Sequence, residues 1–419
     1  MSPIAALLLL LCAQDWPRFR GPTGQGHSEE TGIPLSWDAT TNVAWKTAIP
    51  GEGWSSPVVW GDNVFLTTAG DGGKSCHVLC LSATDGKVLW NTKVFDQPTE
   101  RKEGKNSWAT PTPCTDGKRV YAVFGGGGAA ALDVDGTVAW TNLEVKFYSR
   151  HGLGASPIVH DGLLVMPYDG SARVDKAGQY PKVTEEERTG WQIPWDKAEV
   201  VALDAATGKR AWTGKRGMSR IAHATPIIVD GQILSIAGDV VQGFDPKTGK
   251  LLWTATSEGE GLTPSPVTAD GMVFTSSGFP TKTLRGIKLG GSGDVTKTHL
   301  VWEQKKGVPT QPSLLVVKPH LYAVTEDGVA SCFKPESGEI VWQERVTPTK
   351  SAFSASPVHA DGRIYLLSES GETTVLAPGA EFKVLSRNPL GEKCQASPAI
   401  SRGRIFIRSD KTLFCIKGS

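Results

Sequence analysis

The sequence lacks an excess of charge of either sign, and it lacks an apolar run long enough to cross a membrane. Its 44 Lys and Arg residues balance 43 Asp and Glu residues, so no overall field draws the chain to nucleic acid or to an anionic membrane. The apolar run at residues 7–11 is far shorter than the roughly 20 residues of a spanning helix. We therefore expect neither nucleic-acid binding nor a transmembrane segment.

Familiar catalytic and metal-binding motifs are also missing. The sequence contains no C-x-x-C pair for zinc or haem attachment, no G-x-S-x-G and no H-E-x-x-H. The glycines at 125–128 lack the Gly-Lys-Ser/Thr of a phosphate-binding loop, and Asp133-Val-Asp-Gly lacks the later Glu of a calcium loop. Both strings are interpreted as turns.

Glycine, proline and tryptophan, by contrast, are abundant. The 48 Gly and 27 Pro make up about 18% of the 419 residues, against roughly 12% in average proteins, so turns must be frequent and long helices cannot dominate. The 14 Trp exceed both the 13 Phe and the 6 Tyr. The tryptophans are therefore the feature to explain.

Residues 1–13 are interpreted as a signal peptide. The apolar run ends in Cys12-Ala13, and cleavage is expected after Ala13. Lipid attachment at Cys12 is a weaker alternative, because Leu11 occupies the place of a small residue, and a misassigned start is another. Export predicts a periplasmic or secreted protein.

Six cysteines remain after that cleavage: Cys76, Cys80, Cys114, Cys332, Cys394 and Cys415. Cys76 and Cys80 lie four residues apart in a strand-like run, which separates their Cα atoms by about 13 Å, beyond the roughly 7 Å limit for a disulfide. They can pair only if the chain bends there. Cysteine chemistry is therefore not the visible function.

Half of the tryptophans recur at gaps of 45, 50, 72, 41, 49 and 40 residues, which is a repeat period. They are Trp45, Trp90, Trp140, Trp212, Trp253, Trp302 and Trp342. Five of them end the same kind of string, for example Ala202-Leu-Asp-Ala-Ala-Thr-Gly-Lys-Arg-Ala-Trp212. A short apolar strand, a Gly-containing turn and a second strand predict a hairpin. Trp302 keeps only the tryptophan.

A second recurring feature is a small residue before a proline, followed by an apolar run. It occurs at Pro57, Pro111, Pro157, Pro226, Pro266, Pro312, Pro357 and Pro398. Each proline begins a unit of four strands, and the eighth unit is one strand short. Residues 42–46 supply that strand from the other end of the chain, closing a ring without exposed sheet edges. We predict an all-β, eight-bladed β-propeller over residues 41–419, preceded by a segment at 14–40.

The repeated string resembles the tryptophan-docking motif of PQQ-like β-propellers, the group that includes quinoprotein alcohol dehydrogenases and the assembly factor BamB. Residues 15–22, Asp-Trp-Pro-Arg-Phe-Arg-Gly-Pro, also resemble the start of exported PQQ-like proteins of planctomycete-type bacteria. The resemblance implies that the seven periodic indoles pack between neighbouring blades. It also implies that Cys80, Cys332 and Cys415 occupy a position that must be small.

Nearly all of the irregular loops fall on one face of the predicted propeller, and variable loops on a rigid scaffold are where binding sites usually lie. Residues before the prolines should rim the channel on this face and could bind a planar or sugar-like ligand. The candidates are Trp54, Asn106, Trp108, His151, Arg220, His223, Gln311, Phe353 and Gln395. The alternative for each is that it only packs a blade end.

A long insertion at residues 169–199 in the third unit carries Trp191 and Trp195. It could cover the channel, dock a partner, or form a solvated loop. Asp169 lies at the start of the insertion and is a candidate ligand-binding residue. It could act as a general base or bind a cation, and the alternative is that it is an ordinary loop carboxylate.

The resemblance also frames the choice between enzyme and scaffold. Quinoprotein dehydrogenases of this group are usually longer, pair adjacent cysteines in a disulfide and bind calcium with a Glu/Asn/Asp set. No adjacent cysteines occur here, and that set has no match, so no cofactor is predicted and PQQ with calcium is the alternative. We expect an exported, monomeric, non-catalytic scaffold that binds a protein, an envelope polymer or a carbohydrate. An unrecognised carbohydrate-active enzyme is a further alternative.

Overall fold

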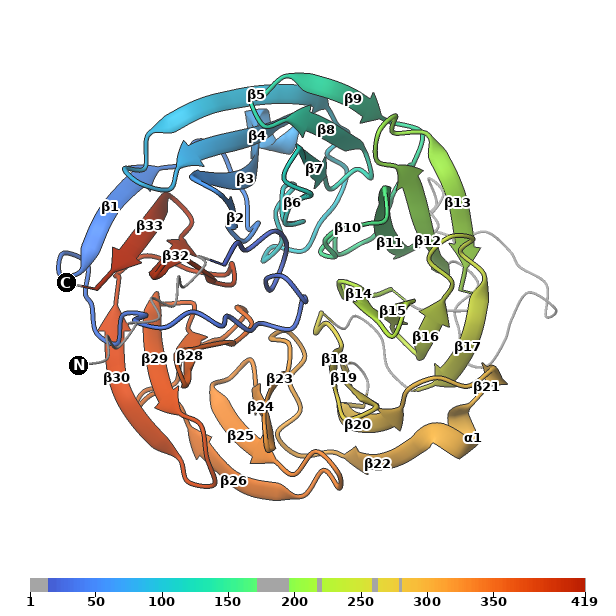
Figure 1. Cartoon of the computed structure of the whole chain (residues 1–419), viewed down its shortest axis with the longest axis vertical. Coiled ribbons are helices and arrows are strands. Elements are labelled where there is room, and N and C mark those ends of the chain that lie inside the picture. Colours follow the sequence, from blue (N-terminus) through green and yellow to red (C-terminus); the bar gives the residue numbers. More distant parts are fainter. Residues whose placement is uncertain (1–13, 172–195, 217–220, 258–262, 279–280, 419) are drawn as a thin grey trace, which may run out of the picture.

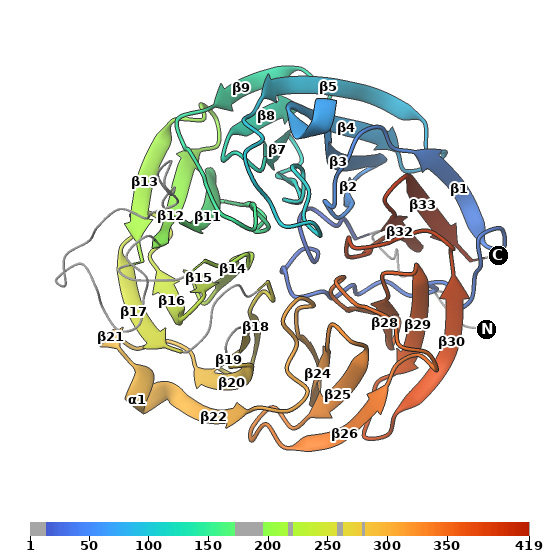
Figure 2. The same cartoon turned by 180° about the vertical axis from the view of Figure 1, so that it is seen from behind.

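A computed structural model describes residues 14–171, 196–216, 221–257, 263–278 and 281–418. The predicted signal peptide, Arg220, Trp191, Trp195 and most of the insertion lie outside these residues. Within them, eight sheets form a closed ring around a central channel, and each contains four antiparallel strands (Figures 1 and 2). The predicted eight-bladed propeller is therefore confirmed, and no described helix is long and apolar enough to span a bilayer.

Each blade consists of four strands that run from the channel to the rim. The first four blades contain β2 (Val58–Trp60), β3 (Asn63–Gly70), β4 (Ser75–Ser82) and β5 (Val88–Asp96); β6 (Cys114–Thr115), β7 (Arg119–Val123), β8 (Ala129–Asp133) and β9 (Val138–Asn142); β10 (Ile158–His160), β11 (Leu163–Ser171), β12 (Asp196–Asp204) and β13 (Arg210–Lys215); and β14 (Ile227–Val229), β15 (Gln232–Ala237), β16 (Val240–Phe244) and β17 (Leu251–Thr256).

The other four blades contain β18 (Val267–Ala269), β19 (Met272–Ser277), β20 (Thr283–Lys288) and β22 (Leu300–Gln304); β23 (Leu315–Val317), β24 (His320–Val324), β25 (Val329–Phe333) and β26 (Ile340–Arg345); β27 (Val358–Ala360), β28 (Arg363–Leu367), β29 (Glu372–Ala377) and β30 (Lys383–Pro389); and β31 (Ala399–Ser401), β32 (Arg404–Arg408), β33 (Thr412–Lys417) and β1 (Val43–Ala48). The helical turns η1 (Asp71–Gly73) and α1 (Thr296–His299) and the short β21 (Gly293–Asp294) lie in connections.

The hydrophobic core lies between blades. Val58 and Phe65 of the first blade, for example, pack with Val120 and Leu132 of the second. The inner strand β3 is buried on both faces, whereas β1 at the rim alternates between half-buried and exposed residues. The blades are thus held by apolar layers that each blade shares with its neighbours.

The N-terminal strand closes the ring as predicted. β1 pairs antiparallel with β33, with Lys46 opposite Phe414 and Thr47 opposite Leu413. Figure 1 shows the blue β1 beside the red β33, so the two ends of the propeller lie in one sheet. This pairing covers the edge that β33 would otherwise expose.

Six of the seven periodic indoles donate an N–H hydrogen bond to a turn of the next blade. The acceptors are the carbonyls of Ala83, Val134, Ala205, Pro246, Pro335 and Gly379, at 2.8–3.1 Å from Trp45, Trp90, Trp140, Trp212, Trp302 and Trp342. Under Trp140 the turn carries Gly208, with φ +72°, where a Cβ would lie 2.5 Å from the indole. Glycine is required there by both the backbone conformation and the close approach.

Trp253 departs from this pattern because the fifth blade lacks the hairpin turn that would receive it. β21 and α1 stand in that place, and Gly293 of β21 pairs with Trp253 in parallel register. The Trp253 N–H donates instead to Oε1 of Gln232 in its own blade, at 2.9 Å. Trp253 is also the most buried of the seven, with 1% of its surface exposed.

All six cysteines of the described chain are buried, and none of them forms a disulfide. The register places Cys80 opposite Trp90, Cys332 opposite Trp342 and Cys415 opposite Trp45. The same place opposite Trp253 is held by Gly243, where a Cβ would come within 2.2 Å of the indole nitrogen. These three cysteines therefore fill a position beside an indole that only a small side chain can occupy.

Residues 14–40, here called the N-terminal segment, cross one end of the channel (Figure 1, blue). Trp16 is fully buried and exchanges backbone hydrogen bonds with Val59 of the first blade. Further along, Gln25 accepts a hydrogen bond from the Thr268 backbone of the fifth blade, and His27 forms a bridge with His359 of the seventh. The segment therefore ties together blades on different sides of the ring.

The N-terminal segment should make stability depend on pH through His27. Burial, together with His359 and Arg20, lowers the pKa of His27 from 6.5 to about 4. Between pH 6.5 and pH 4 the imidazole of His27 is protonated in the unfolded chain but neutral in the folded one. The free energy of unfolding is therefore highest above pH 6.5 and falls as the pH is lowered toward 4. Urea unfolding from pH 7 to 4 should show wild type losing about 2–3 kcal/mol more than His27→Gln. Equal losses in both proteins would contradict this assignment.

Candidate functional site

A closed ring of Ser and Thr residues surrounds the channel where the innermost strands begin. In each blade the backbone N–H of one such residue donates to the side-chain hydroxyl of its counterpart in the next blade, at 2.8–3.0 Å. The members, in order around the ring, are Ser56, Thr112, Ser156, Thr225, Ser265, Ser313, Ser356 and Ser397, whose N–H returns to Ser56. The hydroxyls satisfy backbone donors that would otherwise be buried without partners.

A cavity of about 690 Å³ lies above this ring, on the irregular face of the propeller. Because side chains alternate along an extended chain, the residue two positions before each ring member also faces the channel. These eight residues all line the cavity: Trp54, Thr110, Gly154, His223, Thr263, Gln311, Ser354 and Gln395. Each blade therefore contributes one residue to the cavity wall, Gly154 through its backbone and the other seven through side chains that are uncharged at neutral pH.

The lower part of the cavity is formed by the ring and by the N-terminal segment. Five ring members, Ser56, Thr112, Ser156, Ser356 and Ser397, line it. Phe19 of the N-terminal segment reaches it from the side opposite the loops. The N-terminal segment therefore contributes to the cavity from the face that carries the short turns.

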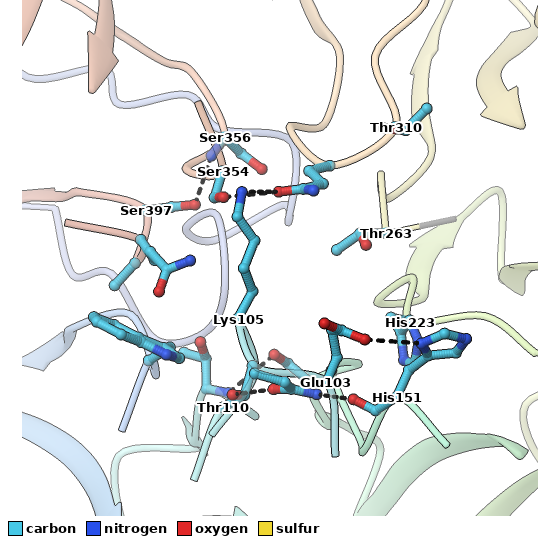
Figure 3. A pocket seen from close by; sticks show the side chains of 18 of the residues that line it. Glu103, Lys105, Thr110, His151, His223, Thr263, Thr310, Ser354, Ser356 and Ser397 are labelled. Atoms are coloured by element: carbon cyan, nitrogen blue, oxygen red, sulfur yellow. Dashed lines mark hydrogen bonds and ion pairs between the residues drawn. The ribbon is translucent and has the colours of Figure 1, made fainter. Parts of the chain in front are cut away.

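Among the described residues, the charged side chains that line the cavity are Glu103, Lys105, Arg150 and Lys282, and all four are exposed. Lys105 extends across the cavity toward Ser354 (Figure 3) and forms a 2.7 Å ion pair with Glu369 of the seventh blade. Lys282 pairs with Glu326, and Glu103 lies 3.9 Å from His151. Most of the charge at the mouth is thus compensated within the protein.

Two buried polar atoms of the cavity wall have no hydrogen-bond partner in the described part of the chain. They are Nδ1 of His223 and Oε1 of Gln395. Burial, with a smaller contribution from His151, lowers the pKa of His223 to about 4, so its ring is neutral at physiological pH. Each buried polar atom that is left without a hydrogen bond destabilises the folded protein by about 1–3 kcal/mol, so such atoms call for an explanation.

The sequence-predicted residues divide between the cavity and the core. Trp54, Asn106, His151, His223, Gln311 and Gln395 line the cavity. Trp108 and Phe353 do not, because they are buried at 8% and 0% exposure, and Trp108 lies against Gly73 and Gly125. Thr110, Thr263, Ser354 and Lys105 line the cavity without having been predicted.

The misplacement of Trp108 follows from the choice of proline in the second blade. Pro111 was the predicted start of that blade, which makes Trp108 the counterpart of Trp54. The hydrogen-bonded ring instead runs through Thr112, followed by Pro113, so the residue facing the channel is Thr110. Phe353 lies three residues before Ser356, and alternation turns it away from the channel.

Asp169 is neither a channel residue nor a loop carboxylate. It lies in β11, opposite Ala198 of β12, and is 1% exposed. The Arg216 guanidinium binds both of its carboxylate oxygens, at 2.5 and 2.9 Å, and also contacts Ser235 and Gln242 of the fourth blade. Burial raises the pKa of Asp169 to about 6, and Arg216 opposes that rise. The pair joins two blades and has no access to a ligand in the cavity.

The cavity residues do not fit PQQ with calcium. PQQ is a planar tricarboxylate, and its calcium requires several oxygen ligands, among which carboxylates are typical. Within the described part of the chain, one carboxylate, that of Glu103, lines the cavity, and its side chain is exposed. Among the described residues no group of three or more His, Cys, Asp or Glu is placed to hold a metal ion.

Known proteins similar to this chain include an assembly factor and a dehydrogenase. The chain is 22% identical over 316 residues to the outer membrane protein assembly factor BamB of Yersinia pestis, covering 70% of each protein. It is 26% identical over 179 residues to the dehydrogenase subunit of the quinone alcohol dehydrogenase of Acetobacter aceti, covering 36% of this chain. The match spans only 23% of that dehydrogenase subunit.

Solved structures of both kinds share the fold. BamB from Moraxella catarrhalis superposes with a TM-score of 0.61 at 14% identity, covering 89% of this chain and 96% of that one. A quinohemoprotein alcohol dehydrogenase from Pseudomonas putida HK5 gives 0.62 at 13% identity, covering 97% and 80%. At these identities the likeness concerns the fold alone.

A match to a family sequence profile shows which family the chain belongs to. The profile described as outer membrane protein assembly factor BamB matches residues 35–179, 196–293, 292–381 and 326–417, which together cover most of the chain. The protein therefore belongs to the BamB-type family of PQQ-like β-propellers.

Proposed function

We propose that the protein is an exported, monomeric, non-catalytic β-propeller that binds a partner in the cell envelope through its irregular face. The observation that carries the proposal is the cavity on that face, where one residue from each blade meets the exposed side chains of Glu103, Lys105, Arg150 and Lys282. The N-terminal segment crosses the opposite end of the channel, which favours the irregular face as the binding side. The family match to an assembly factor supports a scaffold role.

Site-specific crosslinking tests which face binds. A photo-crosslinking amino acid replaces Arg150, which is exposed at the cavity mouth, and in a matched control it replaces Lys247, which is exposed in a turn on the opposite face. With envelope fractions of the source organism, we expect discrete adducts from position 150 and none from position 247. Equal adduct patterns at both positions would contradict the face assignment.

The likeness to quinone-dependent dehydrogenases defines the competing function. A dehydrogenase of this kind would use PQQ for the electron transfer. Incubation of the full chain with PQQ and calcium, followed by dye-linked oxidation of alcohols and sugars, measures it directly. Turnover in that assay would overturn the non-catalytic part of the proposal.

A further inference from the structure

We propose that the buried side chain of Arg20 holds a small inorganic anion of the chloride class, where the N-terminal segment meets the sixth and seventh blades. Arg20 is not among the residues that line the cavity, so this site is separate from the one proposed for a partner. The proposal depends on the burial of the guanidinium, on its unpartnered N–H groups, and on the lack of an ion pair between Arg20 and the carboxylates of the described residues.

Backbone carbonyls hold the Arg20 guanidinium at one of its nitrogens. Nη2 donates to the carbonyl of Gln25 in the N-terminal segment at 3.0 Å and to that of Leu314 at 2.5 Å. A Cβ on Gly26 would lie 2.9 Å from this Nη2 and 3.0 Å from the Pro357 carbonyl. Leu314 directly precedes β23 of the sixth blade, and Pro357 directly precedes β27 of the seventh. The guanidinium therefore lies between the N-terminal segment and the innermost strands of these two blades.

The other nitrogens of this guanidinium have no hydrogen-bond acceptor. Arginine carries N–H groups on Nε and on both terminal nitrogens, and it has no acceptor atom of its own. In Arg20, Nε and Nη1 are buried without a partner in the described part of the chain. The residue is 0% exposed, so bulk water does not reach these groups. Their partner must therefore be an acceptor that is enclosed in the fold together with them.

The guanidinium is also a positive charge without an opposite charge beside it. Burial lowers the pKa of Arg20 from its ordinary value to about 9, so the side chain is charged at neutral pH. This charge contributes to the lowered pKa of the neighbouring His27. A buried charge is costly unless it is both paired and hydrogen-bonded. Water would satisfy the N–H groups but not the charge, whereas an anion satisfies both.

Arg216 and Arg408, which are also fully buried, serve as internal comparisons. Arg216 binds both carboxylate oxygens of Asp169, and Nη1 of Arg408 donates to backbone carbonyls that include the Thr67 carbonyl. Within the described ranges, neither of them has a buried nitrogen without a partner. Arg20 is the exception, and a bound anion would give it the opposite charge that Arg216 receives from Asp169.

The enclosure of Arg20 limits the size of the anion. Because the side chain reaches neither the surface nor the cavity, a carboxylate or phosphate on a larger molecule cannot contact it without opening the fold. A monatomic anion accepts hydrogen bonds from several directions and brings no donor group that would itself need a partner. Chloride and bromide are therefore the probes, and gluconate is the anion that is too large to enter.

Thermal unfolding of the full mature chain tests the site. Sodium chloride replaces sodium gluconate at a constant ionic strength of about 0.5 M, so that the screening of surface charges stays the same. We expect Tm to rise by about 2–4 °C along a saturating curve, with a Kd on the order of 10 mM. Bromide should act as chloride does. A Tm that does not depend on chloride would mean that water alone solvates Arg20, and it would overturn the proposal.

Two variants assign the effect to Arg20. Arg20→Met keeps the length of the side chain but removes its charge and donors, so the dependence of Tm on chloride should disappear. In gluconate this variant should unfold at or above the Tm of wild type, because no unpaired buried charge remains. Arg402→Met changes an exposed arginine that pairs with Asp62, and it should keep the full chloride dependence. The same chloride dependence in Arg20→Met as in wild type would contradict the assignment.

A crystal structure of the wild-type protein grown with sodium bromide is a second measurement, which needs no variant if Arg20→Met does not fold. Anomalous scattering from bromide should give a peak within hydrogen-bond distance of Nε or Nη1 of Arg20. The absence of a peak there would overturn the site. Crosslinking at position 150 does not involve Arg20, so this inference and the proposed function can fail independently.

Discussion

Replacing Trp253 with alanine is expected to lower the free energy of unfolding by about 3–5 kcal/mol, the range for a large aromatic lost from a packed core. Trp253 is 1% exposed and packs with Val241 of its own blade and with Val273 and Ile287 of the fifth blade. The substitution also leaves Gln232 without the indole donor. Urea unfolding followed by far-ultraviolet circular dichroism measures the loss.

Trp342→Ala is the matched control for this prediction. Trp342 occupies the same place in the sixth blade, but it is only partly buried and its N–H reaches the Gly379 carbonyl at the surface. Its loss should therefore be clearly smaller than that of Trp253→Ala. Equal losses, or a negligible effect of Trp253→Ala, would mean that the packing between the fourth and fifth blades is not what holds them together.

Asp169→Ala is expected to cost about 3–5 kcal/mol, because it leaves the buried Arg216 charge without its partner. Both side chains are at most 1% exposed, so water cannot replace the lost carboxylate without a rearrangement. The fourth blade also depends on this guanidinium, which contacts Ser235 and Gln242. Thermal and urea unfolding at pH 7 measure the effect.

Two comparisons make this prediction specific. In Asp169→Leu combined with Arg216→Met no buried charge remains, and the double variant should be more stable than Asp169→Ala. The exposed pair of Lys93 and Asp96 serves as a surface control, and Asp96→Ala should leave the free energy of unfolding close to that of wild type, because water screens the pair. A double variant as unstable as the single one would show that packing, rather than an unpaired charge, dominates.

The fold could be predicted from the sequence because its signals are local and repeated. The periodic tryptophans and the eight prolines recur once per blade, and the strand missing after Cys415 could be matched to residues 42–46. The fifth blade shows the limit of this reasoning. Its hairpin is replaced by β21 and α1, so the new partners of Trp253 had no counterpart elsewhere in the repeat.

The site could be predicted only in part, because it depends on register. The residues before the prolines include Trp54, His223 and Gln311, which do line the cavity. In the second blade the choice of Pro111 instead of Pro113 shifted the predicted position by two residues, from Thr110 to Trp108. Lys105 was missed for another reason. Its partner, Glu369, is 264 residues away in the sequence, and no local pattern reports such a contact.

The N-terminal segment connects blades that are not neighbours in the ring. Trp16 exchanges hydrogen bonds with the first blade, Gln25 accepts one from the fifth, and His27 forms a bridge with the seventh. A ring held only by contacts between neighbours can open at any one of them, whereas a strap across the ring opposes such an opening. The segment therefore acts as a brace for the blades, in addition to the strand pairing of β1 with β33.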